Sequence, residues 1–438
     1  MRLIQLTSGT GSFYCGTCMR DNALVTELRR QGHDALMVPL YLPPVLDETV
    51  ASDGVPLFFG GINVYLQQKS ALFRNTPRWL DRIFDAPGML QAAASKAGTT
   101  SARELGPLTL SMLRGEQGLQ NKELSRLVEW LASTGQPEVV CLSNVLLIGL
   151  ARRIKAETGA TILCFLNGED AFLDSLQEPD RTASWREIAQ RASDVDAFLP
   201  VSQYFGDLMR ERCKLPAERV QVVYPGILLD GYAAAPAAPD PPVLGYLARM
   251  TPGKGLATLV EAYILVRANG RLPNLKLRVA GTRTAADEPF VVSLQERLAA
   301  AGLADDAEFL PNLDRAEKVS FLQSLSALSV PATYGEAFGL YAIEALAAGV
   351  PVVQPRHAAF PELVAATAGV LCEPDDPQSL ATAVEGLLSD PAGARALGEQ
   401  GRQAVLENFG VARMAENILR VCRDLSPNVA GSRASVAR

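Results

Sequence analysis

The chain has 438 residues, of which 48% are hydrophobic, and it carries a formal net charge of −7. This length and composition predict two domains with their own cores, and the acidic balance argues against a dedicated nucleic-acid-binding protein. No run of about 18 apolar residues occurs, and Gly9 interrupts the first apolar run too early for a signal peptide. The seven cysteines, some inside apolar runs, indicate a reduced cytoplasmic protein rather than a disulfide framework.

Strand-like apolar runs alternate with helical patterns through the first half of the chain. This alternation is typical of a parallel sheet covered by helices. We therefore expect residues 1–232 to form a doubly wound, Rossmann-like α/β domain. Its predicted strands are Leu3–Leu6, Ala35–Leu40, Val139–Leu142, Thr161–Leu166, Ala197–Val201 and Val220–Tyr224.

A glycine-containing loop, residues 9–18, follows the first predicted strand. A dinucleotide fingerprint would need Gly-x-Gly-x-x-Gly here and an acidic residue at the end of the second strand. The spacing differs and the second strand ends in Val38-Pro39-Leu40-Tyr41, so NAD binding is not expected. Cys15 and Cys18 could form a redox pair or half of a metal site, although no second Cys or His pair is near to complete zinc coordination. The alternative is two small residues packing under the loop.

The segment from Lys69 to Arg103 departs from this rhythm. It holds six basic and two acidic residues, a local charge of +4, with Trp79, Leu80 and Phe84 among the apolar residues at helical spacing. A basic amphipathic helix is suited to the inner face of an anionic membrane, as a peripheral contact, or to a groove for a lipid acceptor. An ordinary solvated helix packed on the N-terminal sheet is the alternative.

Acidic residues stand at two predicted strand boundaries. Glu169 and Asp170 follow the strand Thr161–Leu166, where they are candidates for binding an acceptor or accepting its proton. Asp170 could equally cap the next helix. Asp194-Val195-Asp196 has the spacing of a metal-binding D-x-D motif, but its place between a helix end and a strand indicates a cap and a turn.

Residues 233–242 are rich in alanine and proline and are predicted to be an interdomain linker. The α/β rhythm then restarts, so we expect a second doubly wound domain over residues 243–410. We also expect a C-terminal helix over 411–425 that packs back on the N-terminal domain, and a flexible tail over 426–438. The predicted strands are Val243–Ala248, Leu275–Ala280, Ala307–Leu310, Leu328–Pro331 and Val350–Gln354.

Two cations follow the first strand of this second domain. Arg249 and Lys254 lie at a strand end and in the glycine-containing loop that leads into a helix. Open α/β sheets bind ligands at such strand ends. The planar fork of arginine and the point charge of lysine together suit a diphosphate.

Two glutamates, Glu336 and Glu344, stand on either side of a predicted helix start. We expect Glu344 to lie in the middle of an apolar stripe that includes Ile343, where a carboxylate needs a polar partner. Backbone amides near Gly339 would favour an anion. Carboxylates for hydroxyls beside amides for phosphate suit a sugar nucleotide.

The Arg-x4-Lys-Gly loop and the Glu-x7-Glu element resemble the donor site of the family 4 retaining glycosyltransferases. Tyr224-Pro225-Gly226-Ile227, Ala280-Gly281 and Pro361-Glu362-Leu363 occur in the order of that family. The resemblance implies a GT-B fold, in which two Rossmann-like domains face each other across a cleft and the second binds most of the nucleotide sugar. It also implies no cofactor and no divalent metal, and it makes the N-terminal domain the acceptor side.

The resemblance further assigns roles to individual residues. Arg249 and Lys254 would hold the donor diphosphate and stabilise its departure. Glu336 would bind hydroxyls of the donor sugar, and Glu344 the ribose diol. Backbone groups would contact the phosphates, the sugar or the acceptor at Gly11, Ser12, Phe338, Gly339 and Leu340.

One departure concerns histidine. Many members of that family carry a histidine near position 167, facing the donor sugar, but this chain has only His33 and His357. His357, in the loop before Pro361, is a further candidate to reach the cleft on the acceptor side.

The sequence thus predicts a retaining, metal-independent glycosyltransferase that moves a hexose from a nucleoside diphosphate sugar to a hydroxyl of a carbohydrate or lipid acceptor. Two alternatives remain open. One is an epimerase or a phosphorylase of the same fold. The other is a non-catalytic sugar-nucleotide-binding subunit, which the missing histidine favours and the intact set of cations and carboxylates disfavours.

Overall fold

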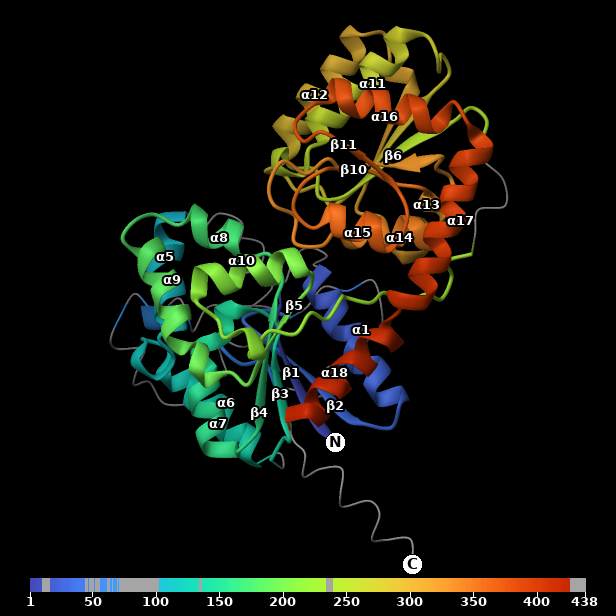
Figure 1. Ribbon diagram of the computed structural model, residues 1–438. Coiled ribbons are helices and arrows are strands. Elements are labelled where there is room, and N and C mark those ends of the chain that lie inside the picture. The colour runs from blue at the N-terminus through green and yellow to red at the C-terminus, as the bar shows by residue number, and fades with distance from the viewer. Residues whose placement is uncertain are drawn as a thin grey trace, which may run out of the picture. The chain divides into compact units, whose positions relative to one another are not determined.

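The computed structural model describes residues 1–9, 16–43, 46, 51, 56–60, 64, 66–68, 70, 102–133, 136–233 and 239–425 (Figure 1). Several predictions lie outside these residues: Gly11, Ser12 and Cys15, most of the basic segment 69–103, and the tail 426–438. The chain divides into two compact units. Unit 1 comprises Met1–Tyr224 and Met414–Arg438, and unit 2 comprises Pro225–Arg413.

Unit 1 is built on a parallel sheet with the strand order β2-β1-β3-β4-β5. The strands run over apolar residues that are almost all buried, as expected for a sheet covered on both faces. Helix α1 packs on β1 and β2, and α10 packs on β4 and β5. The strands are β1 (Arg2–Ser8), β2 (Asp34–Leu40), β3 (Val139–Leu142), β4 (Thr161–Leu166) and β5 (Ala197–Pro200).

The described helices of unit 1 connect these strands. They are α1 (Gly16–Arg30), α5 (Ala102–Leu113), α6 (Asn121–Ser133), α7 (Ala151–Thr158), α8 (Glu169–Ser175), α9 (Asp180–Arg191) and α10 (Gln203–Cys213). Short 3-10 helices cover Gly115–Gln117, Val145–Leu150, Ala192–Asp194 and Ala217–Arg219. The first five predicted strands are therefore confirmed to within two residues at each end.

The sixth predicted strand, Val220–Tyr224, is wrong, because only Val220 forms a bridge, to Phe198. The segment does run beside β5, since the amides of Gln221 and Val223 donate to the carbonyls of Phe198 (2.9 Å) and Pro200 (3.0 Å). A ladder would also need an N–H from Pro200, which proline lacks.

Unit 2 contains a parallel sheet with the order β8-β7-β6-β9, and a separate pair, β10-β11. One bridge, between Leu328 and Val352, joins the two. The predicted strand Leu328–Pro331 shortens to two residues, and β11 was not predicted. The strands are β6 (Val243–Leu247), β7 (Lys276–Gly281), β8 (Ala307–Pro311), β9 (Ala327–Leu328), β10 (Val353–Pro355) and β11 (Val370–Cys372).

Helices pack around this sheet in Figure 1, with α16 beside α11 and α17 beside α14. They are α11 (Leu256–Asn269), α12 (Glu288–Ala300), α13 (Arg315–Gln323), α14 (Leu340–Ala347), α15 (Phe360–Ala366), α16 (Pro377–Leu388) and α17 (Pro391–Asn408), with 3-10 turns at Pro252–Lys254 and Ala304–Asp306. Helix α18 (Val411–Leu425) has the predicted bounds and passes from unit 2 into unit 1 at Met414. The described helices include none that is both long and apolar enough to cross a bilayer.

The segment that opens unit 2, Pro225–Ala233, is fastened to it by hydrogen bonds. Arg315 donates to the carbonyls of Leu228 (3.1 Å) and Asp230 (2.9 Å), and Arg402 donates to that of Tyr232 (2.9 Å). The contact-defined boundary at Tyr224 therefore precedes the predicted linker, 233–242, of which residues 234–238 lie outside the described part.

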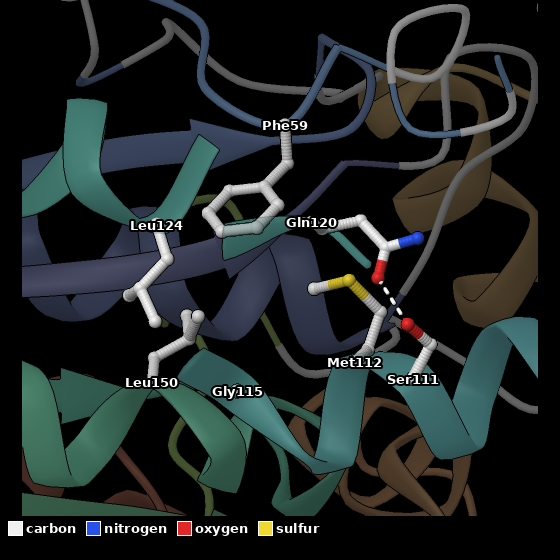
Figure 2. A pocket seen from close by; sticks show the side chains of 7 residues that line it. All are labelled: Phe59, Ser111, Met112, Gly115, Gln120, Leu124 and Leu150. Atoms are coloured by element: carbon white, nitrogen blue, oxygen red, sulfur yellow. Dashed lines mark hydrogen bonds between the residues drawn. The ribbon is translucent and has the colours of Figure 1, made fainter. Parts of the chain in front are cut away.

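A small gap between side chains in unit 1 is too narrow to hold a water molecule (Figure 2). Its two polar side chains satisfy each other, because Ser111 Oγ donates to Gln120 Oε1 at 2.5 Å. The rest of the lining offers a ligand no polar side chain, so we assign this pocket to imperfect packing. It is lined by Phe59, Ser111, Met112, Gly115, Gln120, Leu124 and Leu150.

Candidate active site

The topology of unit 2 brings two loops together. In the order β8-β7-β6-β9 the chain reverses direction across the sheet between β6 and β9, and ligands of open α/β sheets bind at such a switch point, beyond the carboxyl ends of the strands. The loop after β6 carries Arg249 and Lys254, and the loop after β9 carries Glu336. The predicted cations and carboxylate are therefore assembled by strand order.

The backbone of the first loop is tightly seated. Lys254 ends a 3-10 turn, and Gly255 then adopts φ +73° before helix α11 begins. A β-carbon at Gly255 would lie 1.7 Å from the carbonyl oxygen of Pro331, so only glycine fits there. This contact holds the cationic loop against the chain that follows β9.

At the centre of the site, Lys254 and Glu336 form an ion pair. Two phenols join it, since Tyr334 and Tyr341 donate to Glu336 Oε2 at 3.4 and 3.1 Å. The Lys254 ammonium also lies 4.9 Å from the ring centre of Tyr334 and 5.6 Å from that of Tyr341. Such aromatic faces stabilise a cation.

The surroundings keep Lys254 charged and the phenols neutral. Burial lowers the pKa of Lys254, but Glu336 and Tyr334 outweigh it, and the net shift is upward. Burial and then the Glu336 charge raise the pKa of Tyr334 to about 12, and the same causes raise that of Tyr341 well above its usual value. The site therefore offers a fixed cation and phenolic donors at neutral pH.

Arg249 is the more exposed cation. Its side chain is 44% exposed and reaches Asp287 Oδ1 at 3.4 Å. Asp287 itself is buried and accepts from the amide (2.9 Å) and hydroxyl (2.6 Å) of Thr284. Burial raises the pKa of Asp287, but the Thr284 and Arg249 contacts outweigh burial and lower it overall. An anchored carboxylate thus orients an arginine whose side chain is partly exposed.

Gly339 caps α14 in the left-handed region, with φ +93°. A β-carbon there would approach Phe360 Cε1 to 3.0 Å. Phe338 is buried, and its ring is tilted against that of Phe409 with the ring centres 5.9 Å apart. Leu340, the first residue of the helix, is partly buried.

The periodicity predicts that Glu344 lies in the middle of an apolar stripe, but the structure shows a different arrangement. Helix α14 is buried on almost every side, and only Leu340 and Glu344, four residues apart on one face, are partly exposed. The expected polar partner is present, because Glu344 Oε1 meets Lys318 Nζ at 2.8 Å and the Tyr232 hydroxyl at 3.2 Å. Glu344 is thus an anchor for α13 and for the segment that opens unit 2.

His357 lies beside the second loop. Its Nε2 is 3.0 Å from the carbonyl oxygen of Tyr334, which requires Nε2 to carry the proton. The amide of Ala359 donates to the carbonyl of Glu336 at 3.2 Å. The structure thus places His357 against the Glu336 loop of unit 2.

In unit 1, the carboxylate of Glu169 is hydrogen-bonded to backbone amides. Its carboxylate accepts from the amides of Asn167 (2.8 Å), Gly168 (3.1 Å) and Val145 (3.2 Å). Burial nevertheless raises its pKa, because desolvation outweighs these hydrogen bonds. Glu169 therefore joins the loops after β3 and β4 and has little capacity left for an acceptor.

Asn167 lies in the stretch near which the resemblance leads one to expect a histidine. Its Oδ1 accepts from Arg20, and its Nδ2 donates to the Ser143 carbonyl at 2.6 Å. Arg20 is itself buried beside Asp21 and lies 3.9 Å from the centre of the Phe165 ring. Asn167 is thus held in a buried network.

Asp170 is the better candidate of the two acidic neighbours. Burial raises its pKa, and no donor among the described residues reaches its buried Oδ1.

Cys18 donates to the Ser8 carbonyl at 3.1 Å and is buried, as a small packed residue would be.

The D-x-D aspartates are held by cations. Asp194 pairs with Arg152 at 3.2 Å, and Asp196 pairs with Lys155 at 2.5 Å and accepts from the Ile162 amide. Among the residues that the structure describes, no group of three or more His, Cys, Asp or Glu side chains is arranged to hold a metal ion.

Sequence reasoning missed several residues of the site: Tyr246, Asp287, Lys318, Tyr334 and Tyr341. A signal existed for two of them, because Tyr334 and Tyr341 lie two residues before and five residues after Glu336. Asp287 and Lys318 come from other loops and helices, and their roles depend on the packed fold.

Comparison with known proteins matches both halves of the chain. Residues 93–230 match the family described as Glycosyltransferase Family 4, and residues 233–404 match Glycosyl transferases group 1. The D-inositol 3-phosphate glycosyltransferase of Mycobacterium marinum is 27% identical over 245 residues, which cover 54% of this chain and 51% of that protein. The GDP-mannose-dependent alpha-(1-6)-phosphatidylinositol monomannoside mannosyltransferase of Mycolicibacterium smegmatis is 30% identical over 211 residues, 44% of this chain and 53% of that one. These alignments thus span about half the length of each relative.

Solved structures resemble the whole chain. HepE from Anabaena, in complex with UDP and glucose, superposes with a TM-score of 0.68 at 16% identity, over 96% of this chain and 99% of that one. Sucrose-phosphate synthase from Thermosynechococcus elongatus superposes with a TM-score of 0.70 at 18% identity, over 97% and 99%. At these identities the likeness establishes the fold, which is GT-B.

Proposed function

We propose that this chain, which belongs to the family 4 glycosyltransferases, transfers a hexose from a nucleoside diphosphate sugar to an acceptor hydroxyl. The observation that carries the proposal is the Lys254–Glu336 pair at the switch point of the parallel sheet of unit 2, with the partly exposed side chain of Arg249 on the same loop as Lys254. A diphosphate needs cations, and a sugar needs hydroxyl acceptors. The site supplies both within unit 2.

The charges suggest how a donor would bind. In the structure Lys254 is neutralised by Glu336. A donor diphosphate would replace Glu336 as the partner of Lys254 and would also engage Arg249, and the freed carboxylate would accept from hydroxyls of the sugar. The backbone amides at Phe338, Gly339 and Leu340 would add neutral donors.

These cations would also supply the chemistry. As the bond between the sugar and the diphosphate breaks, negative charge develops on the leaving phosphate, and Arg249 and Lys254 would stabilise it without a divalent metal. We propose a retaining, front-face course in which the departing phosphate accepts the proton of the incoming hydroxyl. No cofactor is needed for this reaction.

The names of two similar proteins support a proposal for the chemical class of the acceptor. One similar protein is named for glycosyl transfer to an inositol phosphate, and another for mannosyl transfer from GDP-mannose to a phosphatidylinositol mannoside. We therefore propose a carbohydrate or lipid acceptor with a polyol head group, for which Asp170 of unit 1 is a candidate contact.

The test is a donor screen with site variants. Purified protein is titrated with UDP-, GDP- and ADP-sugars, and release of the nucleoside diphosphate is measured with and without inositol phosphate or a phosphoinositide acceptor. We expect one donor class to be turned over. Arg249→Ala and Lys254→Ala should each lower kcat/KM by roughly 100-fold or more, a loss typical of a removed transition-state contact.

Arg271→Ala is the matched control. Arg271 is a cation of unit 2 whose side chain is 74% exposed and which lies 3.9 Å from Glu385. Its loss should leave kcat/KM unchanged. Full activity in the Arg249 or Lys254 variant would reject the proposed role of the cationic loop.

A further inference from the structure

A buried phenol lies directly beneath the cationic loop. Tyr246 is on β6 and is fully buried. Its hydroxyl donates to two carbonyl oxygens, that of Arg249 at 3.0 Å and that of Lys254 at 3.4 Å. These are the carbonyls of the two residues whose side chains would hold the donor diphosphate.

We propose that Tyr246 is a positioning residue for diphosphate binding, because its hydroxyl bridges the backbones of Arg249 and Lys254 and thereby fixes the spacing of the two cations. This inference rests on the proposed function. Tyr246 contacts no ligand in this scheme and acts only through the loop above it.

The other loop contacts show why one hydroxyl matters. Within the loop, the Thr251 amide donates to the Arg249 carbonyl at 2.8 Å, and the Lys254 amide donates to the Thr251 carbonyl at 3.1 Å. These bonds are local and shape each half of the loop. The Tyr246 hydroxyl is the side-chain group that reaches both ends, from a residue fixed in a central strand of the sheet.

The electrostatics of the site favour this role. Burial, with smaller contributions from Tyr334 and Glu336, raises the pKa of Tyr246 well above its usual value. The phenol therefore remains protonated and is a constant donor across the physiological pH range. A loop held in one conformation loses less entropy when a diphosphate binds between its cations.

Unit 2 contains a matched control residue. Tyr263 on α11 is also fully buried, and its hydroxyl also donates to two carbonyls, those of Leu275 at 3.0 Å and Asp306 at 3.4 Å. The two phenols are thus alike in burial and in their carbonyl partners, although the Tyr263 hydroxyl also accepts from Arg267 Nη1 at 3.1 Å. They differ in what they hold, because the partners of Tyr263 belong to neither loop of the candidate site.

The experiment compares Tyr246→Phe with Tyr263→Phe in the full chain. UDP, GDP and ADP are titrated into the wild type by calorimetry, and the Kd of the best of them is measured for each variant, together with the Kd of the corresponding nucleoside. We expect Tyr246→Phe to weaken the nucleoside diphosphate by roughly threefold to tenfold, the range for one neutral hydrogen bond. Nucleoside binding should not change, and Tyr263→Phe should bind both ligands as the wild type does.

Three results would overturn the inference: unchanged diphosphate binding by Tyr246→Phe, an equal loss in both variants, or an equal loss of diphosphate and nucleoside in Tyr246→Phe. Thermal melting of the two variants checks that both lose similar stability. If the wild type binds none of the three nucleoside diphosphates, the proposed function itself fails, which is a different outcome from a wild type that binds while Tyr246→Phe loses nothing.

Discussion

The charged side chains that we assign to the site in unit 2 already have partners of opposite charge. Lys254 pairs with Glu336, Arg249 with Asp287, and Glu344 with Lys318. A ligand would therefore bind by exchanging partners and not by filling a site of net charge. Such exchange favours a ligand that carries both anionic and hydroxyl groups, because a phosphate alone would leave Glu336 without its cation.

At the residue scale, Asp287 allows a pH-dependent prediction. The pKa of Asp287 is lower in the folded protein than its usual value of 3.8, so the ionised carboxylate stabilises the fold at a pH above 3.8. This contribution is lost as the pH falls through the pKa of the folded state. Asp287→Asn should cost about 1 kcal/mol at pH 7. Thermal melting from pH 3 to pH 7 should show the difference between wild type and variant shrinking below about pH 3.8. A difference that is constant over this range would show that the Asp287 charge is not involved.

The single residues divide into those that a pattern reveals and those that packing reveals. Lys254 and Glu336 could be identified as candidates from the sequence, because Lys254 belongs to the Arg-x4-Lys-Gly motif and Glu336 to the Glu-x7-Glu motif. Glu169 could not be judged from sequence, because the Val145 amide that occupies it comes from the loop after another strand. The partner of Glu344 was predicted to exist, but Lys318 could not be named, because α13 precedes α14 without any periodic relation between the two residues.

At the scale of elements, the start of α14 depends on the left-handed Gly339. Gly339→Ala should destabilise the protein by about 1–2 kcal/mol, because a β-carbon is strained at φ +93° and crowds Phe360. Chemical denaturation measures the effect, and donor binding should weaken with it, since the cap and the Glu336 loop are adjacent.

Gly386 in α16 provides the control. It is exposed, and a β-carbon there would meet no atom within 4 Å. Gly386→Ala should stabilise the protein by roughly 0.5–1 kcal/mol, the helical preference for alanine over glycine. Equal changes in stability for the two substitutions would mean that the left-handed backbone conformation of Gly339 does not require glycine.

The strands show where prediction from pattern ends. Runs such as Val139–Leu142 and Thr161–Leu166 are buried on both faces, and their bounds follow from their apolar residues. The segment Val220–Tyr224 has the same apolar character, but its pairing depends on a proline in its neighbour, β5. Strand β11 is three residues long, too short to stand out from its surroundings.

At the scale of the molecule, the residues before the alanine- and proline-rich segment belong to unit 2. Tyr232 is buried and its hydroxyl binds Glu344, while its carbonyl accepts from Arg402. Tyr232→Ala should destabilise unit 2 by about 3 kcal/mol, as the loss of a large buried side chain does. Hydrogen exchange of the full chain should then rise in α13, α14 and α17 and stay unchanged in β1–β5.

Phe205→Ala tests the converse. Phe205 on α10 is fully buried in unit 1, so its loss should raise exchange in unit 1 and leave α13 and α14 protected. If Tyr232→Ala raised exchange in β1–β5 instead, Tyr232 would not belong to unit 2.

The composition of the sequence shows where a chain cannot form a helix or strand. The boundary between the two units, however, depends on which neighbours the residues before the alanine- and proline-rich segment contact.

The burial of α14 also limits which insertions and deletions the chain can tolerate. Each added or removed residue turns the rest of a helix by about 100°. Of the eight residues in this helix, only Leu340 and Glu344 are partly exposed. One residue gained or lost between Gly339 and Glu344 would carry the carboxylate away from Lys318 and into the apolar interior. The spacing between Gly339 and Glu344 is thus a requirement of folding, and related chains should vary in length outside this helix and not within it.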